Sequence, residues 1–172
     1  ILEAGGGILS TVRATRAATA DELVNETHPR VWEMLRHGTT TAEAKTGYGL
    51  ETTSELRMLE ALLRLNAEEP LELAITFLGA HAVAPEYKDD PDGYTRHLCN
   101  EMLPKVKQWW QHATPLRLPF VDVFCERGAF NLKQSQRILK TAREMGFPLK
   151  IHADEFENLG GASLAAKLGA VS

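Results

Sequence analysis

The chain has 172 residues, of which 44% are hydrophobic and 24% charged, so it can bury one ordinary core and lacks the composition of a disordered protein. Its net charge of −4 comes from charges of both signs along the whole length, without a basic block, which argues against a nucleic-acid partner. No apolar run reaches the roughly 18 residues that cross a membrane, and the first residues lack the pattern of a signal peptide, so we expect a cytoplasmic protein.

The first part of the chain predicts a helix, a strand and a tight turn. Residues 19–37 open with a Thr or Asp cap, carry apolar residues at helical spacing and stop at Gly38, which predicts an amphipathic helix. Residues 39–45 are rich in β-branched side chains and predict a short strand. The motif Gly47-Tyr48-Gly49 that follows is typical of a turn.

The next part repeats this order. A second helix is predicted from Thr52 to about Glu68, with Glu55 three residues after Thr52 at the spacing of a capping box. The nearly continuous apolar stretch at residues 71–78 favours a strand covered on both faces. Residues 85–93 are polar and turn-rich, which predicts a loop at the working end of the fold.

Further helix and strand patterns complete the chain. A helix is expected over about residues 94–112, with Pro104 as a kink or break in its interior. The remaining predicted elements are a strand at 120–125, a helix at 131–145, a strand at 149–152 and a helix at 162–168.

Four strands alternating with helices of about ten or more residues predict an α/β protein with a parallel sheet and right-handed crossovers. Periodicity does not choose between a doubly wound sheet and a (β/α)8 barrel, but no strand is followed by GxGxxG or a P-loop. Polar side chains instead follow successive strands, where barrel enzymes build their active sites. These residues are Lys45, Tyr48, His81, Glu126, Arg127, His152, Asp154 and Glu155.

The sharpest local signal is Ile151-His152-Ala153-Asp154-Glu155, which places an imidazole at the end of an apolar strand beside two carboxylates. Imidazole binds zinc or iron, and a neighbouring carboxylate can take a proton from water that a metal activates. The alternative is a histidine that only satisfies a backbone carbonyl.

His81 repeats this placement at the end of another apolar strand, after the small residues Gly79 and Ala80. Two such histidines on one parallel sheet converge, although a capping role stays open for His81. Tyr48 lies on a turn flanked by glycines, where packing is the ordinary role of a tyrosine.

Several other features have simpler explanations. The Gly5-Gly6-Gly7 run lacks the Lys-Ser or Lys-Thr and the preceding strand of a phosphate-binding loop. Arg13 and Arg16 either meet an anionic substrate or are solvated. Trp109 and Trp110 are explained by packing or as a surface left uncovered by truncation, and His28, His37, His97 and His112 by helix dipoles. Cys99 and Cys125 form no CxxC motif and are expected to be reduced and mostly buried.

Six motifs occur in one order along almost the whole chain. They are residues 5–12 (beginning Gly5-Gly6-Gly7), Gly47-Tyr48-Gly49-Leu50-Glu51, Phe77-Leu78-Gly79-Ala80-His81-Ala82, Pro85-Glu86-Tyr87, Lys150-Ile151-His152-Ala153-Asp154-Glu155 and Leu159-Gly160-Gly161-Ala162. In order and approximate spacing the chain resembles the imidazolonepropionase family of metal-dependent amidohydrolases. It departs from the family at Thr46, where Ser is expected, and in a longer stretch at residues 116–120.

The resemblance implies hydrolysis of the cyclic amide of 4-imidazolone-5-propanoate to N-formimidoyl-L-glutamate in histidine degradation, with one zinc or iron ion in a (β/α)8 barrel. It implies that His152 is a metal ligand and that Glu155 contacts the substrate and the attacking water. Tyr48 and His81 match substrate-binding positions, and His81, if protonated or donating a hydrogen bond, would stabilise the oxyanion of the tetrahedral intermediate.

The resemblance also implies that most of the metal site lies elsewhere. The family's His-x-His pair and its Asp ligand have no counterpart in these residues, and a catalytic metal needs about three protein ligands. A full barrel needs eight strands, so we expect residues 1–172 to be one partial domain of about four βα units, cut at both ends from the centre of a longer chain. We expect this chain alone to be inactive.

A half-barrel would leave two unpaired sheet edges and an apolar interior face, so we also expect self-association, for example as a homodimer. Two other functions stay open: another amidohydrolase, such as a deaminase of a heterocyclic base, and a non-catalytic binding module built on a degenerate half-barrel.

Overall fold

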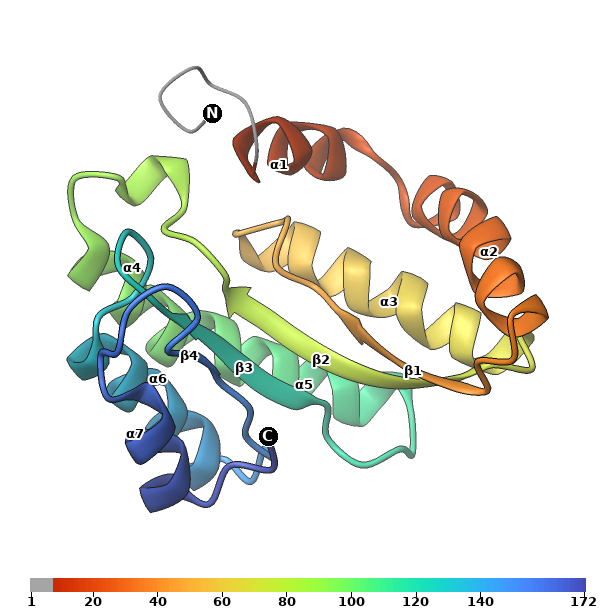
Figure 1. Ribbon diagram of the computed structural model, residues 1–172. Coiled ribbons are helices and arrows are strands. Elements are labelled where there is room, and N and C mark those ends of the chain that lie inside the picture. Colours follow the sequence, from red (N-terminus) through yellow and green to blue (C-terminus); the bar gives the residue numbers. More distant parts are fainter. Residues whose placement is uncertain (1–7) are drawn as a thin grey trace.

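The computed structural model describes residues 8–172, and the Gly5-Gly6-Gly7 run lies outside this range. Its centre is a four-stranded parallel sheet that curls like part of a (β/α)8 barrel (Figure 1). The strands lie in chain order: β1 (Thr41–Lys45), β2 (Glu72–Ala80), β3 (Phe120–Cys125) and β4 (His152–Ala153). The predicted α/β class and parallel sheet are confirmed.

The connections between strands contain helices, as right-handed parallel crossovers require. The helices are α1 (Ile8–Ala17), α2 (Ala20–Arg36), α3 (Thr52–Glu68), α4 (Pro91–His97), α5 (Leu103–Ala113), α6 (Leu132–Glu144) and α7 (Gly161–Leu168), with a 3-10 turn η2 (Pro85–Tyr87) and a π-helical turn η3 (Leu98–Met102). Helix α1 was not predicted. Within residues 8–172, every helix is too short or too polar to cross a membrane.

Alternating side chains give the sheet two different faces. On one face, Ile75 and Phe77 of β2 and Val123 of β3 pack into the core with helices α3, α5 and α6. The opposite face, the barrel interior, carries Glu43 and Asp122 among other charged residues. The prediction of an apolar interior face was therefore wrong. The two edge strands, β1 and β4, are present as expected, and self-association stays a prediction.

Two local predictions need correction. The N-cap of α3 is Glu51, which makes no side-chain capping bond, so the Thr52 and Glu55 capping box does not form. The long helix predicted at 94–112 is divided by η3, where the Leu103 N–H bonds the Leu98 carbonyl five residues earlier. Pro104, which has no N–H to donate, lies just beyond this wide turn in the first turn of α5.

Other residues singled out from the sequence are structural. Trp110 is buried and its indole N–H donates to the Arg117 carbonyl, 3.0 Å away. Both cysteines are buried and reduced, as predicted. His28 lies inside α2 with Nε2 2.7 Å from a Glu69 carboxylate oxygen, so contact with this side chain replaces the expected helix-dipole explanation.

Candidate active site at the carboxyl ends of the strands

The loop after β1 presents Tyr48 on a backbone that only specific residues allow. Gly47 has φ +107°, and a Cβ there would lie 2.7 Å from the Leu78 carbonyl oxygen and 3.0 Å from His81 Cβ. Leu50 also has a positive φ of 53°. This close approach to β2 is why glycine is required before Tyr48.

Side chains satisfy the backbone groups of this loop. The buried Glu55 carboxylate accepts the N–H groups of Gly47, Gly49 and Leu50. Arg16 of α1 donates to the Gly49 carbonyl at 2.7 Å and pairs with the Glu86 carboxylate. Arg16 therefore links α1 to the Tyr48 loop and to Glu86, and its guanidinium is already paired and not free for an anionic substrate.

His81 follows β2 and lies against the Tyr48 loop. Its Nδ1 is 3.0 Å from the Gly47 carbonyl oxygen, and the Tyr48 and His81 ring centroids are 5.0 Å apart, edge to face. Burial lowers the pKa of His81, against the opposing effect of the bond to Gly47. The two residues predicted to bind substrate are thus in direct contact.

His152 opens β4, one strand beyond β3, where Asp122 is buried on the interior face. Nδ1 of His152 lies 2.9 Å from Oδ2 of Asp122, and Nζ of Lys45 lies 2.8 Å from the same oxygen. The Asp122 carboxylate raises the pKa of His152, which burial would lower. The Phe124 ring stands between the histidines, 6.0 Å from His81 and 5.6 Å from His152.

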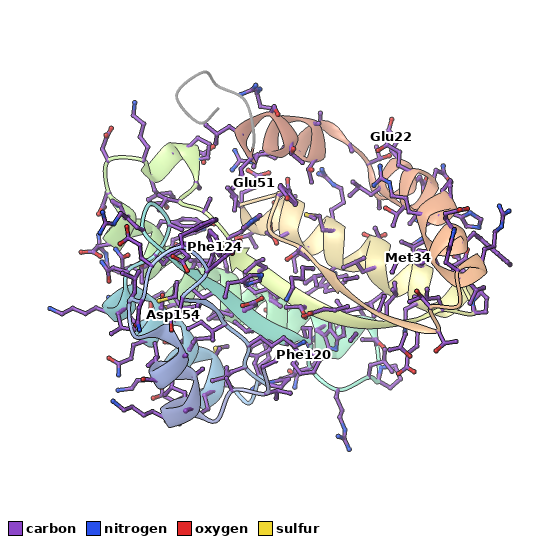
Figure 2. The ribbon with its side chains drawn as sticks, in the orientation of Figure 1. Glu22, Met34, Glu51, Phe120, Phe124 and Asp154 are labelled. Atoms are coloured by element: carbon purple, nitrogen blue, oxygen red, sulfur yellow. The ribbon has the colours of Figure 1, made fainter. Side chains whose placement is uncertain are left out.

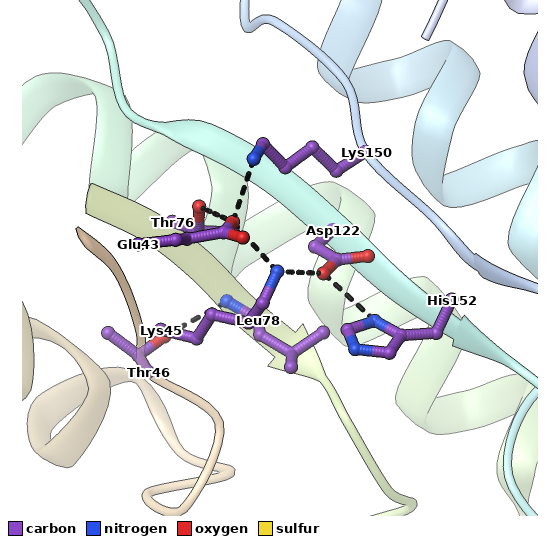
Figure 3. Close-up of polar contacts among 8 residues, drawn as sticks. All are labelled: Glu43, Lys45, Thr46, Thr76, Leu78, Asp122, Lys150 and His152. Carbon is purple, nitrogen blue, oxygen red and sulfur yellow. Dashed lines mark hydrogen bonds and ion pairs between the residues drawn. The ribbon is translucent and has the colours of Figure 1, made fainter. Parts of the chain in front are cut away.

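The charged network extends deeper into the barrel interior from Lys45 (Figure 3). The Glu43 carboxylate is 2.7 Å from Lys45 Nζ, 2.6 Å from the Thr76 hydroxyl and 3.0 Å from Lys150 Nζ. Partial burial opposes ionisation of Glu43, but these hydrogen bonds outweigh it and lower its pKa to about 2. Four strands therefore share one polar network on the interior face.

The loop after β4 carries Glu155, whose side chain is exposed. Its backbone N–H donates to the buried carboxylate of Glu126, at 2.6 Å. Asp154 accepts from Leu159 and Ala162, which fixes the loop to the start of α7. Figure 2 shows Asp154 and Phe124 toward the same end of the sheet. Glu155 is at the expected strand end, but no contact joins its side chain to Tyr48 or His81.

A cavity of about 520 Å³ opens at this end of the sheet. It is lined by His81 just after β2, Phe124 of β3, Phe156 of the loop after β4, and Lys88 and Arg127 of flanking loops. Its lining combines aromatic and aliphatic side chains with two cations, of which Arg127 is paired with Glu157. Tyr48, His152 and Glu155 lie outside its lining.

Sequence reasoning missed Asp122 and Glu43, and misassigned Glu55. The first two are charges inside strand segments whose neighbours are apolar or small, Phe120–Cys125 and Thr41–Lys45. Such charges signal an interior face that is functional or polar. Nothing local distinguished Glu55 from a capping residue.

The metal implied by the resemblance can be tested against these residues. Within residues 8–172, no group of three or more His, Cys, Asp or Glu side chains is arranged to hold a metal ion. His152 fits as a single ligand, because its pairing with Asp122 through Nδ1 leaves Nε2 available. The described residues thus provide one position of such a site and not the whole of it.

Comparison with known proteins supports the family assignment. No family model matches the chain. Curated imidazolonepropionases do: those of Herpetosiphon aurantiacus, Chloroflexus aggregans and Shouchella clausii are 53%, 53% and 51% identical to it over 173, 178 and 172 residues. Each match covers 100% of this chain but only 40%, 41% and 37% of the relative. Over its whole length the chain is a homologue of the imidazolonepropionases, matching a segment of about two fifths of those proteins.

Proposed function

We propose that this chain forms the substrate-binding part of an enzyme that hydrolyses 4-imidazolone-5-propanoate to N-formimidoyl-L-glutamate. The observation that carries the proposal is the direct contact of Tyr48 with His81, on neighbouring strand ends. His152, two strands beyond His81, contacts the other side of this group through the Phe124 ring. The identity of about 50% to imidazolonepropionases over the whole chain supports the same reaction.

The hydrogen bond of His81 defines what this side chain offers a substrate. A carbonyl oxygen only accepts, so Nδ1 carries the proton that is donated to Gly47. Neutral His81 therefore presents a lone pair at Nε2, which accepts a hydrogen bond from a ring N–H of the imidazolone. The oxyanion role expected for His81 requires the imidazolium, which burial disfavours.

His152 would hold one position of the zinc or iron site, with Asp122 fixing its ring. A bound ion would lower the pKa of water and polarise the ring carbonyl. The described residues supply a single ligand, so the other ligands of the ion would come from outside residues 8–172.

Glu155 would act on the proton of the attacking water. Water adds to the ring carbonyl carbon while Glu155 accepts its proton, and the same carboxyl group returns the proton to the ring nitrogen as the C–N bond breaks. The exposed position of the side chain, after β4, leaves it free to approach a bound substrate.

A chimera tests the proposal. The matching segment of the Herpetosiphon aurantiacus imidazolonepropionase is replaced by this chain, and hydrolysis of imidazolonepropanoate is measured with Tyr48→Phe, His81→Ala and Glu155→Gln variants. We expect the chimera to be active, the first two variants to raise KM and Glu155→Gln to abolish most turnover. Glu60→Gln, on an exposed position of α3, is the matched control. An inactive chimera, or full activity of Glu155→Gln, would contradict the proposal.

The same assay separates the other functions. A heterocyclic base deaminase would release ammonia from an aminated ring and ignore imidazolonepropanoate, whereas a binding module would bind ligand equally well with Glu155→Gln. The 172-residue chain by itself should show no turnover, since its residues 8–172 supply one predicted metal ligand. Measurable hydrolysis by the purified chain would disprove that expectation.

A further inference from the structure

We propose that Glu55 is a positioning residue that sets Tyr48 and His81 for substrate binding. The inference rests on the proposed function for its effect on catalysis. Its structural basis is the conformation of the Tyr48 loop, which folds around the Glu55 carboxylate.

Glu55 has no exposed surface, although it carries a carboxylate. One oxygen, Oε1, accepts the N–H of Gly49 at 2.8 Å and that of Leu50 at 2.9 Å, and Oε2 accepts the Gly47 N–H at 3.1 Å. The Thr46 hydroxyl hydrogen-bonds the same carboxylate. The oxygen of this hydroxyl also accepts the Leu78 N–H of β2, at 3.0 Å. Each donor belongs to the loop before Glu55 in the sequence.

This arrangement is not explained by helix capping. Glu55 lies in the first turns of α3, but its side chain bonds the Tyr48 loop and none of the helix's own free N–H groups. Burying a carboxylate is costly unless hydrogen bonds compensate it. Despite this cost, the Glu55 carboxylate is buried against the loop that carries Tyr48, a predicted substrate-binding residue.

The hydrogen-bond partners of Glu55 suit a carboxylate, although its burial opposes ionisation. Full burial raises the pKa of Glu55 above its ordinary value, and the hydrogen bonds from Thr46 and three backbone N–H groups offset only part of this rise. The three backbone N–H groups can only donate, so a proton on an oxygen that they bond would disrupt the set. The loop geometry therefore suits an ionised carboxylate.

Gly47 connects Glu55 to His81. Its N–H donates to Glu55, while its carbonyl accepts from Nδ1 of His81. Fixing the backbone of this one residue, on both sides of its Cα, therefore fixes the His81 ring and its Nδ1–H tautomer. Tyr48, next in the chain, packs edge to face on the same ring.

The test on the chain uses Glu55→Gln, which keeps the shape but places an NH2 group among donors. We expect the amide proton shifts of Gly47 and Gly49 and the Nδ1–H signature of His81, measured by NMR, to change. In Glu55→Ala the vacated space should bind formate, which should restore these signals in a saturable way. Glu60→Gln and Glu60→Ala are matched controls on the same helix. Unchanged signals in Glu55→Gln would overturn the proposal.

The second measurement uses the active chimera described above. Glu55→Gln should raise KM at least about tenfold with a smaller change in kcat, and formate should lower the KM of Glu55→Ala. If the unsubstituted chimera is inactive, the proposed function fails while the NMR test still decides the positioning role. If the chimera is active and Glu55→Gln leaves KM unchanged, the positioning role fails alone. A Glu55→Ala chain that does not fold leaves the decision to Glu55→Gln.

Discussion

Nδ1 of His152 and Oδ2 of Asp122 lie 2.9 Å apart, although the two residues come from neighbouring strands and are 30 positions apart in the chain. A carboxylate at this distance orients the ring and leaves its other nitrogen for a ligand. Lys45, 2.8 Å from the same oxygen, compensates the buried negative charge. The three side chains form one unit across β1, β3 and β4.

Substituting Asp122 should weaken metal binding without changing the predicted ligand itself. In the chimera, Asp122→Asn should lower zinc affinity by about 10- to 100-fold, the usual effect of removing a carboxylate behind a ligating histidine. Competition with a chelator measures this independently of turnover. Asp21→Asn, which removes an exposed partner of Arg64, is the control. Equal zinc affinity in Asp122→Asn and the control would show that Asp122 does not orient a ligand.

Glu43 should make the free energy of unfolding of the chain depend on pH in the acidic range. Its pKa is about 2 in the folded state, below the value of about 4.3 expected for an unfolded chain. The stabilisation is therefore complete above pH 4.3 and is lost as the pH falls through about 2. Urea unfolding midpoints should show Glu43→Gln less stable at neutral pH, with the difference shrinking in acid. A difference that is constant from pH 6 to pH 2 would contradict this assignment.

Gly47 should tolerate no side chain. Gly47→Ala and Gly128→Ala both place a Cβ on a backbone with positive φ, but only the Cβ at Gly47 meets other atoms within 4 Å. Both variants therefore bear the conformational strain, and Gly47→Ala alone bears the clash with β2. We expect Gly47→Ala to be less stable than Gly128→Ala by about 1–3 kcal/mol in urea unfolding. Equal stability of the two variants would mean that the loop relaxes away from β2 freely.

The order of strands and helices could be predicted because local patterns determine it. Caps, apolar stripes and glycines mark the ends of α2 and α6 in the sequence itself. The parallel order also predicted that Tyr48, His81 and His152 would converge at one end of the sheet. The sequence did not predict which charged side chains pair with one another across the strands.

Asp122 and Glu55 illustrate the difference. Each has its partners on other elements or in another loop, so neither its register nor its burial is encoded in neighbouring residues. At Glu55 the spacing from Thr52 fitted a helix cap, and the competing hydrogen bonds to the Tyr48 loop prevailed. The polar interior face likewise depends on pairing Glu43 with Lys150 of a distant segment.

Glu126 should hold the backbone that presents Glu155. Its Oε1 accepts the N–H groups of Glu155 at 2.6 Å and Phe156 at 3.4 Å, while Oε2 is buried without a hydrogen-bond partner. Glu126→Gln retains an accepting oxygen for both N–H groups and places its NH2 group at the position that already lacks a partner, so it should keep the loop ordered. Glu126→Ala removes both bonds and should expose the loop amides to solvent.

Hydrogen exchange of the Glu155 amide distinguishes the two variants. Its protection should be close to the unsubstituted level in Glu126→Gln and fall by at least about tenfold in Glu126→Ala, since each 1.4 kcal/mol of lost local stability changes an opening equilibrium tenfold. The Gly49 amide, bonded to Glu55 on a different loop, is an internal control and should be unaffected. If Glu126→Ala leaves the Glu155 amide protected, the loop is held by Asp154 and α7 instead, through the bonds to Leu159 and Ala162.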